Sequence, residues 1–432
     1  MNAASPGIET NSMNINESTK QYISAHASDD VAHLALHPSK DPQVDMAAAL
    51  QQIAGRQKAK EKLPEWYATE GILYPKKVSM EQCSSSQTAE YKASLVEGKS
   101  FADFSGGFGV DTAAFARKFM KGCYVEPQQE LCELFQHNCK VLDINNVDIV
   151  NGTMEESLVN IDHVDMIYLD PSRRDTHGRR VVSLTDCTPN LLEWKSALLD
   201  HCNILMVKMS PMIDIFQTLR DLPETYAIHV VAVERECKEV VFLLKRDDNS
   251  DNGMYRDAKF CVSTTGKTAT EINITDPTII AIDINKTAIS RVETDLQTER
   301  ATPSHVATEL GTYLYEPNAA VMKAGIFNSL SEQFRIKKLA KNTNLFTSDE
   351  LHEDFPGRVF TIEAVHEFHP RKTAKELSHL TSANIAVRNF PLTAEELRKA
   401  LKIKDGNERY LFGCTLSDGK KVIFLTKKIQ GE

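Results

Sequence analysis

Short apolar runs alternate with stretches of helical periodicity between residues 98 and 245, and this alternation constrains the fold more than any other feature. The runs "SFADFSG", "GCYVEP", "VDIVNG", "VDMIYLD" and "NILMVKMS" have the length and apolar content of buried strands, whereas stretches such as "QQELCELFQHNCKVL" are helical. Two later runs, "YAIHVVAVE" and "KEVVFLLKR", lie only a few residues apart and are typical of a hairpin. We therefore predict an α/β fold with a largely parallel sheet, helices on both faces and an antiparallel hairpin at its end.

The length and composition indicate a globular protein of several domains. A chain of 432 residues is too long for one hydrophobic core, and its 41% hydrophobic and 25% charged residues are typical of globular proteins. The opening residues contain no apolar run of signal-peptide length, and no segment approaches the roughly 18 apolar residues that cross a bilayer. The nine cysteines have no metal-ligand spacing, so we predict reduced thiols in a cytoplasmic protein with no metal and no membrane association.

We predict four parts along the chain. Residues 1–95 are polar and mostly helical, and the first 20 or so have a composition typical of disorder. Residues 96–250 form the α/β domain, residues 251–355 a connecting α+β segment, and residues 356–432 a small α+β module. The pattern of this module is strand, helix, strand, helix and then a hairpin that turns at Gly419.

The charge is distributed unevenly along the chain. The net charge of −10 argues against a uniformly basic nucleic-acid binder, but residues 371–432 carry 13 Lys and Arg against 7 Asp and Glu. Such a segment is suited to binding phosphate groups, and it is equally typical of an ordinary lysine-rich surface. The charge pattern alone leaves both interpretations open.

A glycine-rich turn follows the first predicted strand. Gly106, Gly107 and Gly109 lie between "FADF" and the helical "TAAFARKF", where glycine lets the backbone approach a ligand closely. The helix N-terminus at such a turn suits either a dinucleotide or S-adenosylmethionine. A dinucleotide motif would continue to a third glycine or alanine, but Thr112 occupies that position. Asp103 precedes the turn, where a carboxylate suits the positive amino-acid group of S-adenosylmethionine better than a pyrophosphate.

Further polar positions follow the other predicted strands. Glu126 ends the second strand, where a carboxylate can accept hydrogen bonds from both ribose hydroxyls. Thr153 and Met154 follow the third strand, beside the expected adenine, and Asp170 ends the fourth. Because parallel strands bring their carboxyl ends to one edge of the sheet, we predict that these residues line a single crevice. A helix cap or a surface acid explains any one of them alone, whereas the ordered set favours a cofactor site.

This block resembles the class I S-adenosylmethionine-dependent methyltransferases. More narrowly, the chain resembles a bacterial family in which a methyltransferase domain with a seven-stranded sheet is followed by a ferredoxin-like segment and a THUMP-like domain. The stretches that carry the resemblance are "EQCSSSQTAEYKASL", "DFSGGFGVDT", "LDPSRRD", "VKMSPMID", "ECKEVVFLL", "YLYEPNAAVMKAGIF" and "ANIAVRNFPLTAEELRK". The resemblance implies S-adenosylmethionine as the cofactor. By the usual association of THUMP domains with RNA-modifying enzymes, it also implies ribosomal or transfer RNA as the partner.

The resemblance extends the expected cofactor site upstream. It favours Gln82 and Ser85 as pocket residues, although capping the next helix is the ordinary role of such a serine. The complete predicted cofactor set is Gln82, Ser85, Asp103, Ser105, Gly107, Gly109, Asp111, Glu126, Pro127, Thr153, Met154 and Asp170.

The loop after the fourth strand faces the methyl acceptor in this fold. Amino-methylating enzymes of the class have Asp or Asn there, followed by two prolines and an aromatic residue. Asp170 and Pro171 match this pattern, but Ser172 and Arg173 do not. We predict Asp170, Pro171 and Ser172 as the catalytic residues, with the Asp170 carboxylate orienting an N–H group or acting as a base.

Basic residues near this loop are the predicted substrate contacts. Arg173 and Arg174 lie in the loop itself, and Lys208 ends the fifth predicted strand. Guanidinium groups stack on bases and bind phosphate, so we predict that these three side chains bind the substrate. The alternatives are an internal salt-bridge network for the arginines and a lysine whose ammonium simply reaches solvent.

We therefore expect an S-adenosylmethionine-dependent methyltransferase that acts on structured RNA docked by the C-terminal module. Two alternatives remain open. One is a non-catalytic RNA-binding or assembly factor that retains the pocket, which the altered loop favours. The other is a methyltransferase that acts on a protein or a small molecule. The sequence contains no indication of the oligomeric state.

Overall fold

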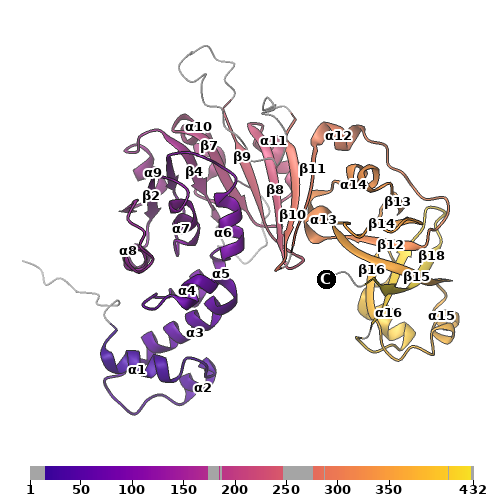
Figure 1. Ribbon diagram of the computed structural model, residues 1–432, viewed down its shortest axis with the longest axis horizontal. Helices are drawn as coiled ribbons and strands as arrows, with labels where there is room; N and C mark the ends of the chain where they lie inside the picture. Colours follow the sequence, from indigo (N-terminus) through magenta and orange to yellow (C-terminus); the bar gives the residue numbers. More distant parts are fainter. Residues whose placement is uncertain are drawn as a thin grey trace, which may run out of the picture. The chain divides into compact units, whose positions relative to one another are not determined.

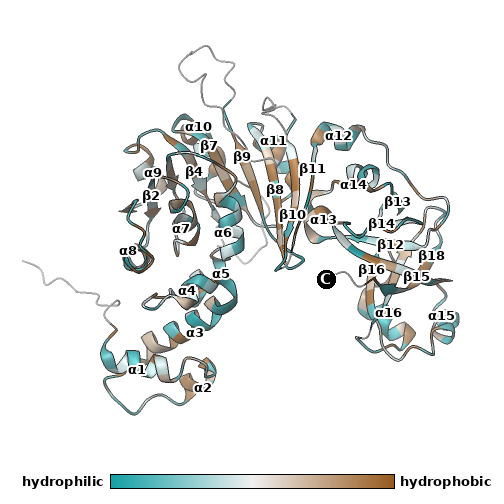
Figure 2. Ribbon diagram, viewed as in Figure 1, coloured by the Kyte–Doolittle hydropathy of each residue, from teal (hydrophilic) through white to brown (hydrophobic). Residues whose placement is uncertain are grey.

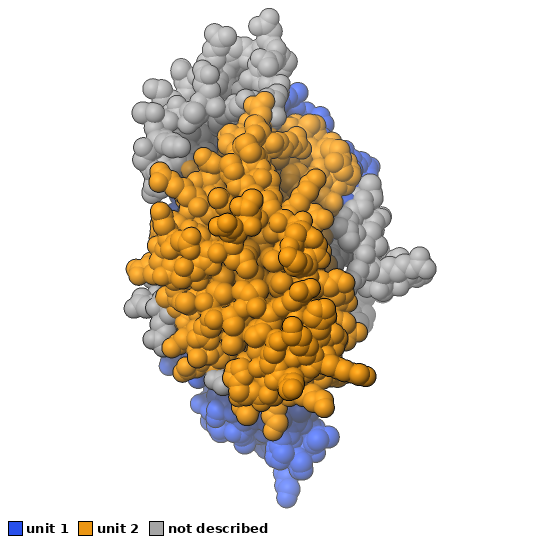
Figure 3. Space-filling model, turned by 90° about the vertical axis from the view of Figure 1, so that its right-hand side faces the viewer, with its two compact units in different colours: residues 1–208, 243–272 blue, residues 209–242, 273–432 orange. Residues whose placement is uncertain are grey.

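The computed structural model describes residues 15–173, 184, 187–246, 276–286, 288–406 and 408–429. The chain divides into two compact units, which are coloured separately in Figure 3. Unit 1 comprises residues 1–208 and 243–272, and unit 2 comprises residues 209–242 and 273–432. The expected disorder in the first 20 or so residues falls largely on residues 1–14, and the expected substrate contact by Arg174 falls on that residue; both lie outside the described residues.

Short helices make up the chain before the first strand (Figure 1). They are α1 (Glu17–Ala25), α2 (Val31–Leu36), α3 (Met46–Lys62), α4 (Pro64–Ala68), α5 (Lys77–Gln82) and α6 (Ser86–Ala93). Asn16, Asp30 and Asp45 cap the first three, each accepting the backbone N–H of the residue three positions on. Helix α3 packs against α1, α2, α4 and α5 and buries Ala49 and Ile53, so it forms the centre of this helical region.

Five parallel strands form the α/β part of unit 1, in the order β7-β4-β1-β2-β3. They are β1 (Ser100–Asp103), β2 (Lys121–Glu126), β3 (Val147–Asn151), β4 (Val164–Leu169) and β7 (Cys202–Met209). The connections contain helices α7 (Val110–Ala116), α8 (Gln129–Val141), α9 (Met154–Leu158) and α10 (Leu191–Asp200), and the short pair β5 (Ser172–Arg173) and β6 (Cys187–Thr188). Strands β1 and β4 are almost wholly buried, as expected for parallel strands covered on both faces. The carboxyl ends of β1, β2, β3 and β4 therefore share one edge of the sheet.

Unit 2 contains the predicted hairpin. Its strands β8 (Thr225–Val233) and β9 (Glu236–Leu244) are largely brown in Figure 2 because of their apolar composition. The turn consists of Glu234 and Arg235, whose φ values of 49° and 68° are the positive values that a tight hairpin turn requires. Strand β10 (Thr278–Ile284) pairs in parallel with β8, and β11 (Ile289–Asp295) pairs antiparallel with β10. The α/β class is thus confirmed, and β10 and β11 are two strands beyond the seven expected.

A second sheet of seven strands occupies the C-terminal part of unit 2, in the order β13-β14-β12-β15-β18-β17-β16. The strands are β12 (Tyr313–Pro317), β13 (Lys337–Ala340), β14 (Thr343–Ser348), β15 (Gly357–Glu367), β16 (Asn384–Arg388), β17 (Arg409–Thr415) and β18 (Lys421–Lys428). The helices of unit 2 are α11 (Ile215–Asp221), α12 (Leu296–Ala301), α13 (Ala319–Ala324), α14 (Phe327–Phe334), α15 (Pro370–Glu376) and α16 (Ala394–Leu401). One apolar cluster of this sheet includes Phe360 and Phe412, and another includes Leu411 and Leu397 of α16. Successive strand residues point to opposite faces, so the sheet has a core on each side.

Candidate active site

The glycine-rich turn joins the end of β1 to α7. Gly107 and Gly109 have φ values of +53° and +83°, which favour glycine. A Cβ atom on Gly109 would lie 2.0 Å from the ring of Phe135, and one on Gly106 would lie 2.3 Å from the ring of Tyr124. A Cβ atom on Gly107 would meet only the Ser105 carbonyl oxygen, at 3.6 Å. The turn is thus pressed against β2 and α8 at two of its glycines and open at the third.

Asp103 lies beneath this turn and is 1% exposed. Its Oδ1 accepts hydrogen bonds from the Ser105 backbone N–H at 2.9 Å and the Ser105 hydroxyl at 3.1 Å, and its Oδ2 accepts the Thr112 hydroxyl at 2.6 Å. Burial raises the pKa of Asp103 to about 7, although these hydrogen bonds act to lower it. The carboxyl group therefore fixes the start of the turn and titrates near neutral pH.

Glu126 joins the loops that follow β1 and β2. Its Oε2 accepts the Gly107 N–H at 3.0 Å, and its Oε1 accepts the Gln128 N–H at 2.9 Å. The residue is 6% exposed. Asn151, at the end of β3, donates to the carbonyl oxygens of Glu126 and Pro127 at 3.0 and 3.1 Å. The ends of three neighbouring strands are thereby linked at Glu126, through its carboxylate to the turn after β1 and through its backbone carbonyl to β3.

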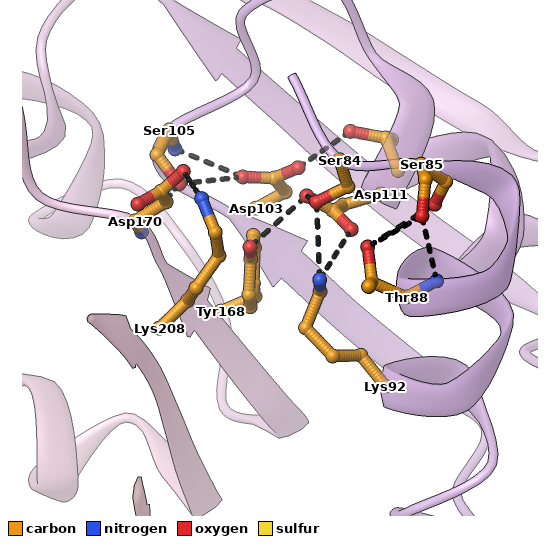
Figure 4. A network of polar contacts seen from close by, with 11 residues as sticks. Ser84, Ser85, Thr88, Lys92, Asp103, Ser105, Asp111, Tyr168, Asp170 and Lys208 are labelled. Carbon is orange, nitrogen blue, oxygen red and sulfur yellow. Dashed lines mark hydrogen bonds and ion pairs between the residues drawn. The ribbon is translucent and has the colours of Figure 1, made fainter. Parts of the chain in front are cut away.

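A buried ion pair connects α6 to α7. Lys92 is fully buried, and its ammonium lies 3.2 Å from the Asp111 carboxylate (Figure 4). Asp111 also accepts the Ser84 hydroxyl at 2.8 Å and the Tyr168 hydroxyl at 3.0 Å. Burial acts to raise the pKa of Asp111, but the nearby charges of Lys92 and Lys208 outweigh it and hold that pKa below its usual value. Asp111 is therefore ionised, and it anchors the serine-rich segment to the first turn of α7.

Sequence reasoning included Asp111 but missed Ser84, Lys92 and Tyr168. A lysine in "SQTAEYKA" is polar and has the helix propensity of a surface residue, so its burial leaves little trace in the sequence. The one available signal is its position four residues after Thr88, on the same face of α6 as this buried threonine.

The remaining predicted cofactor residues lie at helix ends. Ser85 is the N-cap of α6 and accepts the Thr88 N–H at 3.2 Å, whereas Gln82 is exposed at the end of α5. Thr153 caps α9 in a capping box with Glu156, and the following Met154 is buried. The capping role that the sequence left open is thus observed for Ser85.

Asp170 and Lys208 meet at the end of β4. The Lys208 ammonium, on neighbouring β7, forms an ion pair and hydrogen bond with the Asp170 carboxylate (Figure 4). The Asp170 backbone N–H donates to the Ser105 hydroxyl at 2.8 Å, which ties this loop to the turn after β1. With 34% of its side chain exposed, Asp170 can reach a second partner. Lys208 therefore has a carboxylate partner rather than a purely solvent-directed ammonium.

The next residues of the loop form a short strand. Pro171 is buried, and the exposed Ser172 begins β5, whose register pairs it with Thr188 of β6. The Ser172 hydroxyl donates to the Thr188 carbonyl at 3.3 Å. Arg173 is the second residue of β5.

Within the described residues, no group of three or more His, Cys, Asp or Glu side chains could hold a metal ion. The helices in the described ranges also include none with the length and apolar character needed to cross a membrane. The polar groups described at the sheet edge are carboxylates, hydroxyls, a lysine and backbone amides.

Comparison with solved structures identified a relative along nearly the whole chain. It is the crystal structure of a candidate methyltransferase from Porphyromonas gingivalis W83, with a TM-score of 0.81 and 30% sequence identity over 96% of this chain and 98% of that chain. Two further structures each match 37% of this chain. One is an rRNA methylase from Streptococcus thermophilus, of which 95% is covered. The other is a candidate methyltransferase from Streptococcus mutans in complex with SAH, of which 96% is covered. Their identities are 14% and 10% and their TM-scores 0.28 and 0.29, too low to establish anything further.

Family models identify the C-terminal domains. A ferredoxin-like domain family matches residues 313–356, and a THUMP domain-like family matches residues 357–428. The search of curated proteins found no match. Together with the full-length relative, these matches confirm the resemblance seen in the sequence. The chain belongs to the family of class I methyltransferase-fold proteins that carry a ferredoxin-like and a THUMP-like domain at the C-terminus.

Proposed function

We propose that this protein is an S-adenosylmethionine-dependent methyltransferase that acts on structured RNA, either ribosomal or transfer RNA. The observation that carries the proposal is the set of hydrogen bonds that ties the loops after β1, β2 and β4 together at one sheet edge. The candidate methyltransferase from Porphyromonas gingivalis supports the reaction class, and the THUMP-like match supports an RNA substrate. We also propose a cytoplasmic location, because the cysteines within the described ranges are free thiols.

Glu126 is the residue that we propose for the ribose hydroxyls of the cofactor. Each of its carboxylate oxygens accepts one backbone N–H, and a carboxylate has about four lone-pair sites. It therefore retains acceptor capacity for two hydroxyl groups. Gly107 leaves room beside it, because only a carbonyl oxygen at 3.6 Å lies near the position of a Cβ atom.

With the ribose at Glu126, the proposed roles of the other cofactor residues follow from their order along the sheet edge. Thr153 and Met154 come after the next strand, β3, and are proposed for the adenine. Ser105 and the glycine turn are proposed for the methionine part, with Asp103 holding the turn in shape from below. Gln82 and Ser85 are proposed to bind the carboxylate of the methionine part.

Asp170 is the residue that we propose to handle the acceptor proton. When bound, S-adenosylmethionine supplies an electrophilic methyl group. The Asp170 carboxylate accepts the N–H or O–H of the acceptor group and takes its proton at an Oδ atom as the nucleophile attacks. Lys208 holds that carboxylate in place through the ion pair.

Methyl transfer to RNA tests the proposal. The protein is incubated with tritiated S-adenosylmethionine and total RNA from cells that lack it. We expect transfer by the unchanged protein, and a loss of about 100-fold or more in Asp170→Asn with cofactor affinity changed less than about threefold. Asp148→Asn, which removes an exposed carboxylate on β3 that pairs with Lys121, is the matched control and should retain full activity. Full activity in Asp170→Asn would contradict the assignment.

Two observations favour a second candidate, a non-catalytic RNA-binding or assembly factor. Ser172 stands where amino-methylating enzymes have proline, and Lys208 already neutralises Asp170. Binding of both S-adenosylmethionine and RNA without label transfer would support that function. Label that resists nuclease but is removed by protease, or that appears in a small molecule, would instead indicate a methyltransferase with a different substrate.

A further inference from the structure

Phe108 lies between the two glycines of positive φ in the turn after β1. Its ring is 2% exposed, so it is held inside the protein, whereas Gly107 and Gly109 on either side have no side chain to hold them. A glycine-rich turn has many accessible backbone conformations, and binding a ligand requires only one of them. The packing of Phe108 therefore helps to decide how well the turn is prepared for a ligand.

The ring of Phe108 packs against two aromatic residues from the helical region that precedes β1. Its centre lies 4.8 Å from that of the Trp66 ring of α4, in an edge-to-face arrangement, and 6.4 Å from that of the Tyr74 ring. Trp66 and Tyr74 are 3% and 2% exposed, and the Tyr74 hydroxyl donates to the Trp66 carbonyl oxygen at 3.2 Å. Residues 64–74, which we call the aromatic strap, thus hold Phe108 with two rings, all within unit 1.

The aromatic strap is anchored to helices on two sides. Gln52 of α3 donates to the Tyr74 carbonyl oxygen and accepts the Tyr74 N–H, each at 2.9 Å. The buried Asn138 of α8 makes the same pair of hydrogen bonds with Leu73, also at 2.9 Å. The strap therefore joins α3 to α8, the helix against which Gly109 is pressed.

Phe108 is bonded directly to Gly107, whose peptide groups set the position of Glu126. The Gly107 N–H donates to Glu126 Oε2 at 3.0 Å, and the Gly107 carbonyl oxygen accepts the Tyr124 hydroxyl at 2.7 Å. A shift of the Phe108 ring would move these peptide groups and weaken both hydrogen bonds, because hydrogen bonds depend on alignment. The aromatic strap is thus linked to the proposed ribose carboxylate through the turn itself.

The same helical region also holds a second wall of the proposed cofactor site. Lys62, the last residue of α3, donates to the carbonyl oxygens of Met80 and Glu81 at 3.0 and 2.8 Å. These carbonyls lie in the last turn of α5, where a cation is favourable. The segment that follows contains Gln82 and Ser85, two further proposed cofactor residues. Lys62 therefore holds this segment as the aromatic strap holds the glycine turn.

We propose that the helical region before β1 is a positioning element of the cofactor site, in which Trp66 and Phe108 together hold the glycine turn ready for S-adenosylmethionine. This inference rests on the proposed cofactor, and it assigns a role to a region that the proposed function leaves without one. Ordering that is completed during folding does not oppose binding, so a turn that is already ordered binds more tightly. Loosening the contact between Trp66 and Phe108 should therefore weaken cofactor binding.

Calorimetric titration of the full chain with S-adenosylhomocysteine tests the pair. Trp66→Leu and Phe108→Leu should each weaken binding by about tenfold, because each removes one ring of the contact. The double variant should bind about as weakly as either single variant, because both changes break the same contact. Trp66→Phe keeps an aromatic ring and should stay within about threefold of the unchanged protein. Tyr67→Leu is the matched control, because it removes the neighbouring ring of α4, which lies 4.9 Å from the Arg56 guanidinium, and should leave binding unchanged.

Hydrogen exchange in the unchanged protein gives a second readout, which does not depend on whether a variant folds. If the aromatic strap supports the turn, S-adenosylhomocysteine must stabilise the strap in return, and the strap amides should exchange about threefold more slowly or less. Equal affinities of Trp66→Leu and Tyr67→Leu, or unchanged exchange in the strap, would contradict the positioning role. No binding by the unchanged protein would overturn both the proposed cofactor and this inference. Binding without methyl transfer to RNA would overturn only the proposed reaction.

Discussion

Lys92 and Lys428 are lysines that are fully and partly buried, respectively, and their surroundings differ. Lys92, in the α/β part of unit 1, is fully buried and lies 3.2 Å from the Asp111 carboxylate, with the Ser84 hydroxyl as a further partner at 3.0 Å. For Lys428, in the C-terminal sheet of unit 2, burial lowers the pKa, and the positive charges of Arg235 and Arg358 lower it further. Lys92 stabilises the fold around the candidate active site, because its charge is compensated. At Lys428, by contrast, the charges of Arg235 and Arg358 repel the ammonium.

The difference shows that burial alone does not distinguish a compensated cation from a repelled one. Breaking a buried ion pair is costly, because it leaves an uncompensated charge in the interior. A cation repelled by other cations destabilises the protein slightly. Removing Lys92 should therefore lower stability, whereas removing Lys428 should leave it unchanged or raise it slightly.

The largest effect should come from Lys92→Met. This change leaves the Asp111 carboxylate buried without its counter-ion and should lower the free energy of unfolding by about 3–5 kcal/mol, measured by urea denaturation. Lys140→Met, on the exposed side of α8, is the control and should have little effect. In the double variant Lys92→Met with Asp111→Asn, most of the loss should be recovered. A loss equal to that of the control would mean that Lys92 does not stabilise the pocket.

The pH dependence of stability separates Asp103 from Asp111 within the same pocket. Burial raises the pKa of Asp103 to about 7, so its contribution to stability is full below the unfolded pKa, near 3.8, and is lost as the pH rises to about 7. Relative to Asp103→Asn, the unchanged protein should lose roughly 2–4 kcal/mol between pH 4 and 7 and then level off. If stability plotted against pH ran parallel for the unchanged protein and Asp103→Asn, the pKa of Asp103 would not be raised. The difference in stability between the unchanged protein and Asp111→Asn should instead stay constant between pH 4 and 7, because the pKa of Asp111 is lowered.

A matched pair of glycine substitutions tests whether the turn is held by packing. Both Gly107 and Gly109 have positive φ, so alanine at either position should cost about 1 kcal/mol. Gly109→Ala should cost a further 1–3 kcal/mol or so, because its Cβ would lie 2.0 Å from the Phe135 ring. Thermal unfolding of both variants measures the difference. Equal costs would mean that the ring moves away freely.

The smallest effect, and the one that completes the comparison, is that of Lys428→Met in the absence of anions. Removing the repelled cation should leave stability unchanged or raise it by up to about 1 kcal/mol at low salt. The gain should shrink in high salt, because salt screens the repulsion. A clear loss of stability would show that Lys428 has a compensating partner, as Lys92 does.

Much of the α/β part follows from local sequence patterns. Continuous apolar runs such as "VDMIYLD" identify buried parallel strands, and the adjacent runs at β8 and β9 identify a hairpin. The placement of β10 beside β8 could not be predicted, because pairing between strands so distant in sequence depends on tertiary contacts. The strand and helix order of the C-terminal module was predicted because it consists of short, clearly bounded elements.

The candidate site was predictable only in part. Asp103, Glu126 and Asp170 follow apolar strands, and parallel strands bring such positions to one edge. The partners of these acids were not predictable. Lys92 has the appearance of a surface lysine in the sequence, and the ion pair between Lys208 and Asp170 depends on the pairing of β4 with β7.

Calorimetric titration with S-adenosylhomocysteine, which cannot react, tests most directly whether the sheet edge is a cofactor site. We expect one molecule to bind per chain, with affinity at least about tenfold weaker in Glu126→Gln and unchanged in Asp148→Asn. An absence of binding by the unchanged protein, or equal affinity in Glu126→Gln, would contradict it.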